Sequence, residues 1–247
     1  MSTAAVIIIG NEILSGRTQD ANLAFIGKRL ESLGINLLEA CIIPDDEEII
    51  INTTRNYKER FTYIFTTGGI GPTHDDITTA SIAKLFNVPL EKNPKAVASL
   101  ERHYGSAPIN EARMKMAYIP ANAILIKNPV SGAPGFQIGN VFVLPGIPQI
   151  LQVMFDGITD RLVGGPPILS RNISTNLRES SLAQGLGFLQ SRFTTVSIGS
   201  YPYFKKGRPG INLVMRSTIS SDLEDIYSEI EQLILQTGGK ILDSDTE

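Results

Sequence analysis

Short apolar segments rich in β-branched residues alternate, along the first two thirds of this chain, with longer segments of helical period. The first apolar segment is Ala4 to Ile9, and the apolar positions between residues 19 and 33 recur at spacings of three to four before Gly34. Such alternation is typical of a parallel sheet whose strands are joined by crossover helices. We therefore expect an α/β domain with a doubly wound, mostly parallel sheet over residues 1–163.

The same rhythm predicts the other elements of this domain. We expect strands at 35–43, 61–67, 124–126 and 139–144, and helices after Pro44, at about 75–86, at 94–104, at 108–117 and at 148–160. The strongest linker signal is Gly164-Gly165-Pro166-Pro167. Behind it, the order strand, helix, strand, strand, helix, strand predicts a smaller α+β domain over residues 168–247.

Charge, cysteine content and hydropathy exclude some classes of protein. Twenty-two Lys and Arg against 25 Asp and Glu give a formal net charge of -3, which disfavours binding to a nucleic-acid backbone. Cys41 is the single cysteine, so no internal disulfide can form and we expect a reducing, cytoplasmic setting. The uncharged segment 128–155 is broken by four prolines and four glycines, so we expect no membrane span.

The strongest local signal is the glycine-rich turn at residues 67–73, between a predicted strand and a predicted helix. Backbone N–H groups of such a turn can approach an anion, and a helix N-terminus adds partial positive charge. The turn lacks the Gly-Lys-Ser/Thr ending of the ATPase loop and the third glycine of the dinucleotide fingerprint. A purely structural turn, with Thr73 or Asp75 capping the helix, would need the same glycines. Both a phosphate-binding loop and a tight strand-to-helix turn therefore remain open.

Two acids, Asp75 and Asp76, follow this turn and would repel a bound phosphate unless a cation lay between them. A divalent metal such as Mg²⁺, held by one or two carboxylates and by substrate phosphates, would remove the conflict. Glu12 follows the first strand and is expected at the same edge, because the carboxyl ends of parallel strands meet there. We expect Asp76 and Glu12 to hold the metal, and Asp75 to orient the attacking water or to cap the helix.

Other residues suited to binding follow the same strand ends. Some carry amide or carboxylate side chains, and others lie in uncharged loops that expose their backbone to a ring or a phosphate. The residues expected to contact a substrate are Gly68, Gly69, Gly71, Pro72, Thr73, Asp20, Asn22, Asn128, Gly132, Pro134, Gly135, Gly146 and Pro148.

Five motifs, taken in order, resemble the competence/damage-inducible protein A family. They are Gly10-Asn11-Glu12-Ile13-Leu14-x-Gly16, Asp20-x-Asn22, Thr67-Gly68-Gly69-Ile70-Gly71-Pro72-Thr73-x-Asp75-Asp76-x-Thr78, Asn128 with Ala133-Pro134-Gly135-Phe136, and Leu144-Pro145-Gly146-Ile147-Pro148. The first domain is similar to the molybdopterin-binding domain of molybdenum cofactor biosynthesis proteins and to the corresponding domain of FAD synthase. The smaller domain resembles the KH-like module of the same family.

The resemblance implies a phosphorylated pterin or nucleotide as ligand, hydrolysis of the diphosphate of ADP-ribose or FAD with Mg²⁺, Mn²⁺ or Co²⁺, and a homo-oligomer. Ile150 stands where the family often has a glutamate, and the chain, which ends at Glu247, is expected to lack the amidase domain of longer members. Three functions remain open: a metal-dependent nucleotide pyrophosphatase, a molybdopterin-binding protein of cofactor biosynthesis, and a non-catalytic nucleotide-binding scaffold.

The smaller domain contains one motif associated with RNA. Gly207-Arg208-Pro209-Gly210 matches the Gly-x-x-Gly of a KH loop, which clamps nucleotides. Here it lies between two predicted strands, so we expect a basic hairpin, and nucleic acid is not an expected partner.

Overall fold

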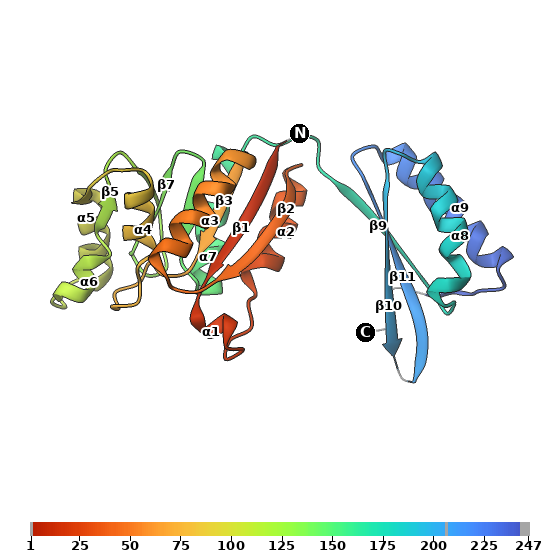
Figure 1. Ribbon diagram of the computed structural model, residues 1–247, viewed down its shortest axis with the longest axis horizontal. Coiled ribbons are helices and arrows are strands. Elements are labelled where there is room, and N and C mark those ends of the chain that lie inside the picture. The colour runs from red at the N-terminus through yellow and green to blue at the C-terminus, as the bar shows by residue number, and fades with distance from the viewer. Residues whose placement is uncertain (1, 206, 243–247) are drawn as a thin grey trace. The chain divides into compact units, whose positions relative to one another are not determined.

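The computed structural model describes residues 2–205 and 207–242, and the chain divides into two compact units (Figure 1). Unit 1 is Met1–Gly165 and unit 2 is Pro166–Glu247. The division falls inside the glycine- and proline-rich segment at 164–167. Each unit has its own sheet and its own apolar core.

The sheet of unit 1 has six strands: β1 (Thr3–Ile9), β2 (Asn36–Ile43), β3 (Tyr63–Thr67), β6 (Ile124–Ile126), β7 (Gly135–Ile138) and β8 (Val141–Leu144). Their order is β2-β1-β3-β8-β7-β6. Strands β2, β1, β3 and β8 are parallel to one another, whereas β7 pairs antiparallel with both β8 and β6. The expected doubly wound, mostly parallel sheet is confirmed.

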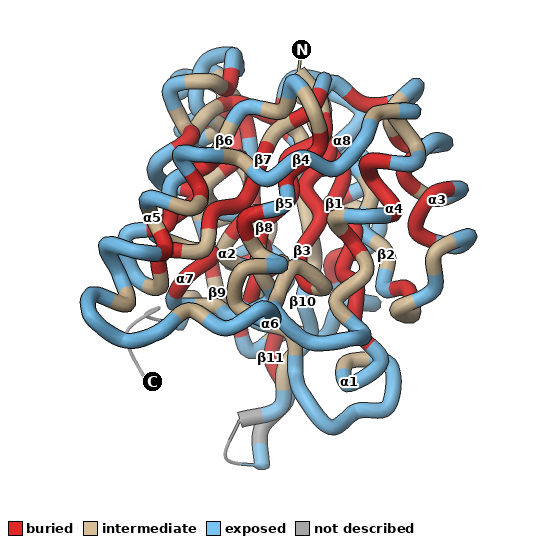
Figure 2. The backbone as a smooth tube through the Cα atoms, turned by 90° about the vertical axis from the view of Figure 1, so that its left-hand side faces the viewer, coloured by how far each residue is buried: buried red, intermediate tan, exposed pale blue. Residues whose placement is uncertain are grey.

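Helices cover both faces of this sheet: α1 (Asn11–Leu14), α2 (Asn22–Ser32), α3 (Glu47–Arg60), α4 (Thr78–Leu85), α5 (Pro94–Tyr104), α6 (Glu111–Lys115) and α7 (Pro148–Asp156), with a short 3-10 turn at Thr159–Arg161. Successive β1 side chains alternate between a core shared with α3, α4 and α5 and a core shared with α2 and α7. A strand buried on both faces is apolar throughout, as the run at Val6–Ile9 is. Figure 2 shows β1, β3 and β8 buried along most of their length. No helix in the described part of the chain is long and apolar enough to cross a membrane.

Several local details of unit 1 differ from expectation, including α1 and β7, which were not predicted. The helix expected from residue 75 begins at Thr78, so Asp75 and Asp76 lie in the preceding loop. The Thr73 amide pairs with the Asp76 carboxylate, and the carbonyls of Thr73 and Asp76 pair with Lys115, in place of the bonds of a helical turn. In addition, β4 (Leu90–Lys92) and β5 (Tyr118–Pro120) form a small antiparallel sheet that was not predicted, because each is only three residues long.

Unit 2 has the predicted element order: β9 (Leu169–Thr175), α8 (Glu179–Arg192), β10 (Ser197–Lys205), β11 (Arg208–Ser217), α9 (Ser220–Gln236) and β12 (Ile241–Leu242). Its antiparallel sheet has the order β10-β11-β9-β12. Both helices pack on one face of this sheet through an apolar core. The Gly-x-x-Gly motif lies in the hairpin between β10 and β11, whose ends pair Lys205 with Arg208.

Candidate functional site

The glycine turn leaves β3 in a conformation that only glycine suits. Gly68 has a φ of 102° and Gly69 a φ of 67°. A Cβ atom on Gly68 would lie 2.2 Å from the carbonyl oxygen of Ile9, and one on Gly69 would lie 2.1 Å from Oγ1 of Thr78. The Gly68 amide donates to the carbonyl of Leu144 at 3.0 Å, so this residue joins β3 to β8. Gly68 is therefore required by the fold itself.

The next three backbone amides of the turn differ from that of Gly68 in their hydrogen bonding. Those of Gly69, Ile70 and Gly71 donate to no acceptor in the parts of the chain that the structure describes. All three residues are partly exposed to solvent. Successive backbone N–H groups without acceptors form a concavity suited to an anion. The turn is thus a candidate phosphate site, with Gly69–Gly71 as its donors.

Two small pockets border the turn, and we name each after one of its charged residues. The Lys115 pocket is lined by Ile70, Gly71, Asp76, Thr79, Ala80, Leu90, Lys115, Met116, Tyr118, Ile119 and Pro134. The Glu12 pocket is lined by Ile8, Ile9, Glu12, Ile13, Thr18, Gln19, Asp20, Ala21, Asn22, Thr67, Gly146 and Pro148. Each has a volume of about 60 Å³, well below the roughly 300–1,000 Å³ of pockets that enclose a drug-sized ligand. A nucleotide would therefore lie across the surface of the turn, with only parts of it inside the pockets.

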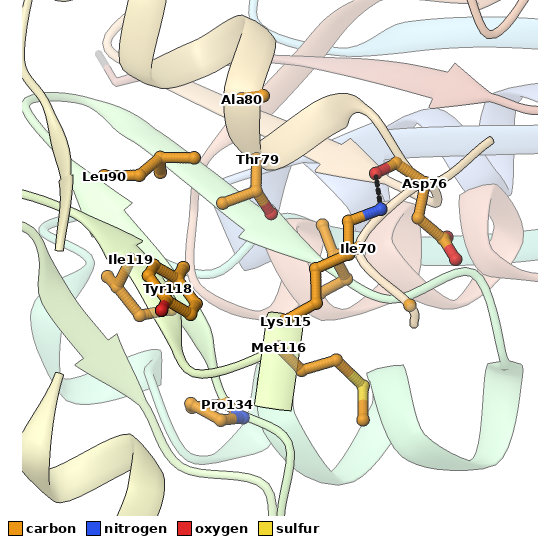
Figure 3. A pocket seen from close by; sticks show the side chains of 11 residues that line it. Ile70, Asp76, Thr79, Ala80, Leu90, Lys115, Met116, Tyr118, Ile119 and Pro134 are labelled. Atoms are coloured by element: carbon orange, nitrogen blue, oxygen red, sulfur yellow. Dashed lines mark hydrogen bonds between the residues drawn. The ribbon is translucent and has the colours of Figure 1, made fainter. Parts of the chain in front are cut away.

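Lys115 supplies the cation of the first pocket (Figure 3). Its Nζ donates to the carbonyl oxygens of Thr73 and Asp76, at 2.5 and 3.0 Å. The Asp76 carboxylate accepts from the amide and the hydroxyl of Thr73, at 2.8 and 2.5 Å, and so closes the loop. Sequence analysis missed Lys115, which lies 39 residues from Asp76. The signal that could have pointed to it was the need for a cation among these acids, but nothing in the local sequence says where that cation comes from.

Asp75 lines neither of these pockets. Its side chain is exposed, and its carboxylate lies 4.0 Å from Nδ1 of the exposed His74. Hydrogen bonding from Thr73, followed by that from its own backbone, lowers the pKa of the Asp75 carboxyl below its ordinary value. Asp75 is therefore ionised at neutral pH, and together with Asp76 it makes this side of the turn acidic.

The Glu12 pocket combines two carboxylates with two buried oxygen atoms. Glu12 is exposed on α1, and Asp20 accepts from the amide of Leu23 at 2.9 Å and so begins α2. The Asn22 side-chain amide donates to the carbonyl of Gly146 at 2.8 Å, while Oδ1 of Asn22 has no partner among the described residues. Oγ1 of Thr67 also has no partner in this described part of the chain, and Asn22 and Thr67 are only 3% and 1% exposed. Buried polar atoms are rarely left unpaired, so this pocket is suited to a small polar guest.

The two expected metal ligands thus lie in different surroundings. Asp76 lines the Lys115 pocket and Glu12 lines the Glu12 pocket, where Asp20 is its carboxylate neighbour. Within residues 2–205 and 207–242 no three His, Cys, Asp or Glu side chains are grouped as a metal site. A metal here would need backbone, amide or substrate oxygens in addition to carboxylates, which Mg²⁺ commonly uses.

The remaining expected contact residues shape the loops around the turn. In the described part of the chain, the Asn128 side chain makes its hydrogen bonds within its own loop, with Val130, Ser131 and Ala133. Pro72 is exposed in the glycine turn. Gly132 packs against His103, and Gly135 packs against the carbonyl of Val143. Pro134 lines the Lys115 pocket, and Gly146 and Pro148 line the Glu12 pocket. Ile150, at the position of the family acid, is buried in the core between α2 and α7.

The unpartnered Thr67 hydroxyl gives a first testable prediction. Thr67→Val removes a buried polar group that costs free energy when unpaired, so we expect the free energy of unfolding to rise by about 1 kcal/mol. If this oxygen serves a ligand, the same variant binds that ligand more weakly. Thr54→Val is the matched control, because Oγ1 of Thr54 on α3 is also buried and unpartnered but lines neither pocket. Urea unfolding and ligand titration of both variants check the prediction, and equal effects on binding would contradict it.

The sequence matches two protein families in series: the probable molybdopterin binding domain over residues 5–164 and the FAD synthase middle domain over residues 167–238. A protein from Caldivirga maquilingensis is 31% identical over 243 residues, which is 94% of each chain. A probable FAD synthase from Caenorhabditis elegans is 29% identical over 261 residues, which cover 94% of this chain but 50% of that protein. The crystal structure of the protein CinA from Thermoplasma acidophilum, of unknown function, is similar with a TM-score of 0.61 and 35% identity over 65% of this chain and 97% of that one.

Proposed function

Because the chain belongs to the family of probable molybdopterin binding domains, we propose that its glycine turn binds the phosphates of a nucleotide or pterin, and that it hydrolyses the diphosphate of ADP-ribose or FAD. The FAD synthase middle domain that matches unit 2, and the similarity to a probable FAD synthase, favour a nucleotide over other phosphorylated ligands.

One observation carries this proposal: three successive backbone amides without acceptors in the described chain lie between a pocket with a lysine and a pocket with two carboxylates. Amides alone would suit any anion. A diphosphate needs, in addition, charge neutralisation on one side and activation of water on the other. Lys115 supplies the positive charge, and Glu12 and Asp20 supply the carboxylates.

Each residue then has a defined part in the reaction. The amides of Gly69, Ile70 and Gly71 hold non-bridging phosphate oxygens, and Lys115 stabilises the negative charge that develops on the diphosphate. A carboxylate of the Glu12 pocket accepts a proton from the attacking water. Asp76 is a positioning residue, because its carboxylate binds Thr73 and keeps the turn closed.

A divalent cation fits the oxygen-only donor set of the Glu12 pocket. Glu12, Asp20 and Oδ1 of Asn22 would hold it, and Asp76 would reach it only through a substrate that spans the turn. When bound, such an ion polarises a phosphoryl oxygen and lowers the pKa of a bound water. Mg²⁺, Mn²⁺ and Co²⁺ all suit carboxylate and amide oxygens.

The direct test is hydrolysis by the purified full chain. ADP-ribose and water should give AMP and ribose 5-phosphate, and FAD and water should give AMP and FMN, in the presence of one of the three metals. Phosphorus NMR of the products measures both reactions. Failure to cleave either compound with any of the metals would reject the pyrophosphatase.

A carboxylate variant tests the metal assignment. We expect Glu12→Gln to raise the metal concentration needed for half-maximal hydrolysis by about tenfold or more, since it removes a negatively charged ligand. Glu48→Gln, which removes an exposed acid from the first turn of α3, is the control and should leave this concentration unchanged. Mn²⁺ binding, measured directly by electron paramagnetic resonance, should likewise be weakened in Glu12→Gln and unchanged in Glu48→Gln. An unchanged metal requirement in Glu12→Gln would place the ion elsewhere.

Molybdopterin binding is the second candidate, favoured by the description of the matching family. Calorimetry with molybdopterin or its adenylate distinguishes it from the first, because micromolar binding without hydrolysis of ADP-ribose or FAD would support this candidate. The buried Ile150 favours a third, a non-catalytic nucleotide-binding scaffold, which predicts binding of ADP-ribose without turnover.

A further inference from the structure

The sheet of unit 2 has one covered face and one open face. Ile173, Ile211 and Leu213 point into the core beneath α8 and α9. Residues that alternate with them lie on the opposite face, which no element in the described part of unit 2 covers (Figure 1). The strand register places on this open face Asn172 and Ser174 of β9, Tyr201 and Tyr203 of β10, and Asn212, Val214 and Arg216 of β11.

The two tyrosine rings lie close against the sheet. A Cβ atom on Gly199 would be 2.7 Å from Cε2 of Tyr201, and one on Gly210 would be 2.5 Å from Cζ of Tyr203. Each ring therefore occupies the space above a glycine. The Cβ atom of any other residue at the glycine position would fill that space. Tyr201 is 49% exposed. A ring that lies over the sheet in this way turns its other side outward, where a second planar group can stack on it.

Acidic and basic residues are distributed unevenly over unit 2. Every acidic residue in the described part of this unit lies on α8 or α9: Glu179, Asp222, Glu224, Asp225, Glu229 and Glu231. The four strands contain none, and Arg216 of β11 lies on the open face, whereas Arg171 of β9 forms an ion pair with Glu224 of α9. The net charge of -3 is that of the whole chain, so it does not describe this distribution within unit 2.

We propose that the open face of unit 2 binds single-stranded nucleic acid, with bases stacked on Tyr201 and Tyr203 and the phosphate backbone near Arg216, on a sheet whose strands carry no acidic residue. An open four-stranded sheet that stacks bases on its aromatic side chains is an established way to hold single-stranded RNA. Asn172 on the same face offers hydrogen bonds to base edges, as does the side-chain NH₂ group of Asn212, whose Oδ1 accepts from Ser174 at 3.3 Å. This activity is separate from the diphosphate chemistry of unit 1, and it revises the expectation drawn from the net charge of the whole chain.

Fluorescence anisotropy with the full chain tests the proposal. The probes are labelled twelve-nucleotide oligothymidylate and oligouridylate, titrated at about 50 and 200 mM salt. We expect saturable binding that weakens steeply with salt, as phosphate contacts require. Tyr201→Ala combined with Tyr203→Ala should weaken binding by about tenfold or more, because stacking contributes roughly 1–3 kcal/mol per base. Tyr201→Phe with Tyr203→Phe, which keeps the rings, should retain it.

Phe188→Ala is the matched control, since Phe188 is an aromatic residue of the same unit, 62% exposed, on α8. Its affinity for the oligonucleotides should equal that of the wild type. Three results would overturn the proposal: no binding at low salt, equal loss in Phe188→Ala, or loss of binding in Lys115→Met with none in the tyrosine variants. The last would place the oligonucleotide on the glycine turn of unit 1. A change of oligomeric state in the Tyr201→Ala and Tyr203→Ala variant, with oligonucleotide binding unchanged, would instead assign the face to a second copy of the chain.

Discussion

Gly68→Ala should lower the free energy of unfolding by about 3 kcal/mol or more and abolish ligand binding. The substitution forces a side chain into a positive-φ conformation and drives its Cβ against the backbone carbonyl of Ile9. Backbone on β1 cannot move aside as a flexible side chain would. Because the chain has no tryptophan, urea unfolding followed by circular dichroism is the suitable measurement.

Gly16→Ala separates the contribution of backbone strain from that of the steric clash with Ile9. Gly16 also has a positive φ, 70°, but a Cβ there would meet nothing within 4 Å. We expect this control to lose only about 1 kcal/mol, from backbone strain alone. Similar losses in both variants would show that the close approach of Gly68 to Ile9 does not constrain the turn.

Lys115→Met should reduce kcat/KM for ADP-ribose about 100-fold, which is typical when a preorganised donor to a developing charge is removed. Lys115→Arg keeps the charge and should recover part of the activity. The unfolding free energy should change by only about 1 kcal/mol, because Lys115 is exposed and the hydrogen bonds it loses join surface loops.

Lys95→Met is the control for charge alone, since Lys95 is exposed on α5 and lines neither pocket. It should leave kcat/KM within about twofold of the wild type, as expected for a surface charge outside the site. Wild-type kinetics in Lys115→Met would show that the lysine has no part in the reaction. The acidic side of the turn would then have no assigned source of positive charge.

Much of the fold was predictable because it follows from local patterns. The apolar run from Ala4 to Ile9 predicted the strand β1, and helical spacing predicted α2 and α5 to within a few residues. The strand order along the chain predicted the parallel sheet, and the five motifs predicted the family, which the matches to both domains confirm.

The site was less predictable, because its parts interact over long distances in the sequence. The start of α4 moved to Thr78 since Lys115, far along the chain, binds the carbonyls that a helix would have used. Gly68 and Gly71 are equivalent in the sequence pattern, yet only the structure shows that the Gly68 amide is taken by Leu144. Likewise, the sequence places Glu12, Asp20 and Asp76 at one sheet edge, but side-chain packing decides which of them share a pocket.

The most direct measurement of the central claim is a backbone amide spectrum of the isotope-labelled protein, recorded as ADP-ribose is added without metal. If the turn holds the diphosphate, the largest shifts belong to the amides of Gly69, Ile70 and Gly71, while the Gly68 amide, already paired with Leu144, moves less. Shifts confined to other parts of the chain, with those three amides unchanged at saturation, would contradict the account.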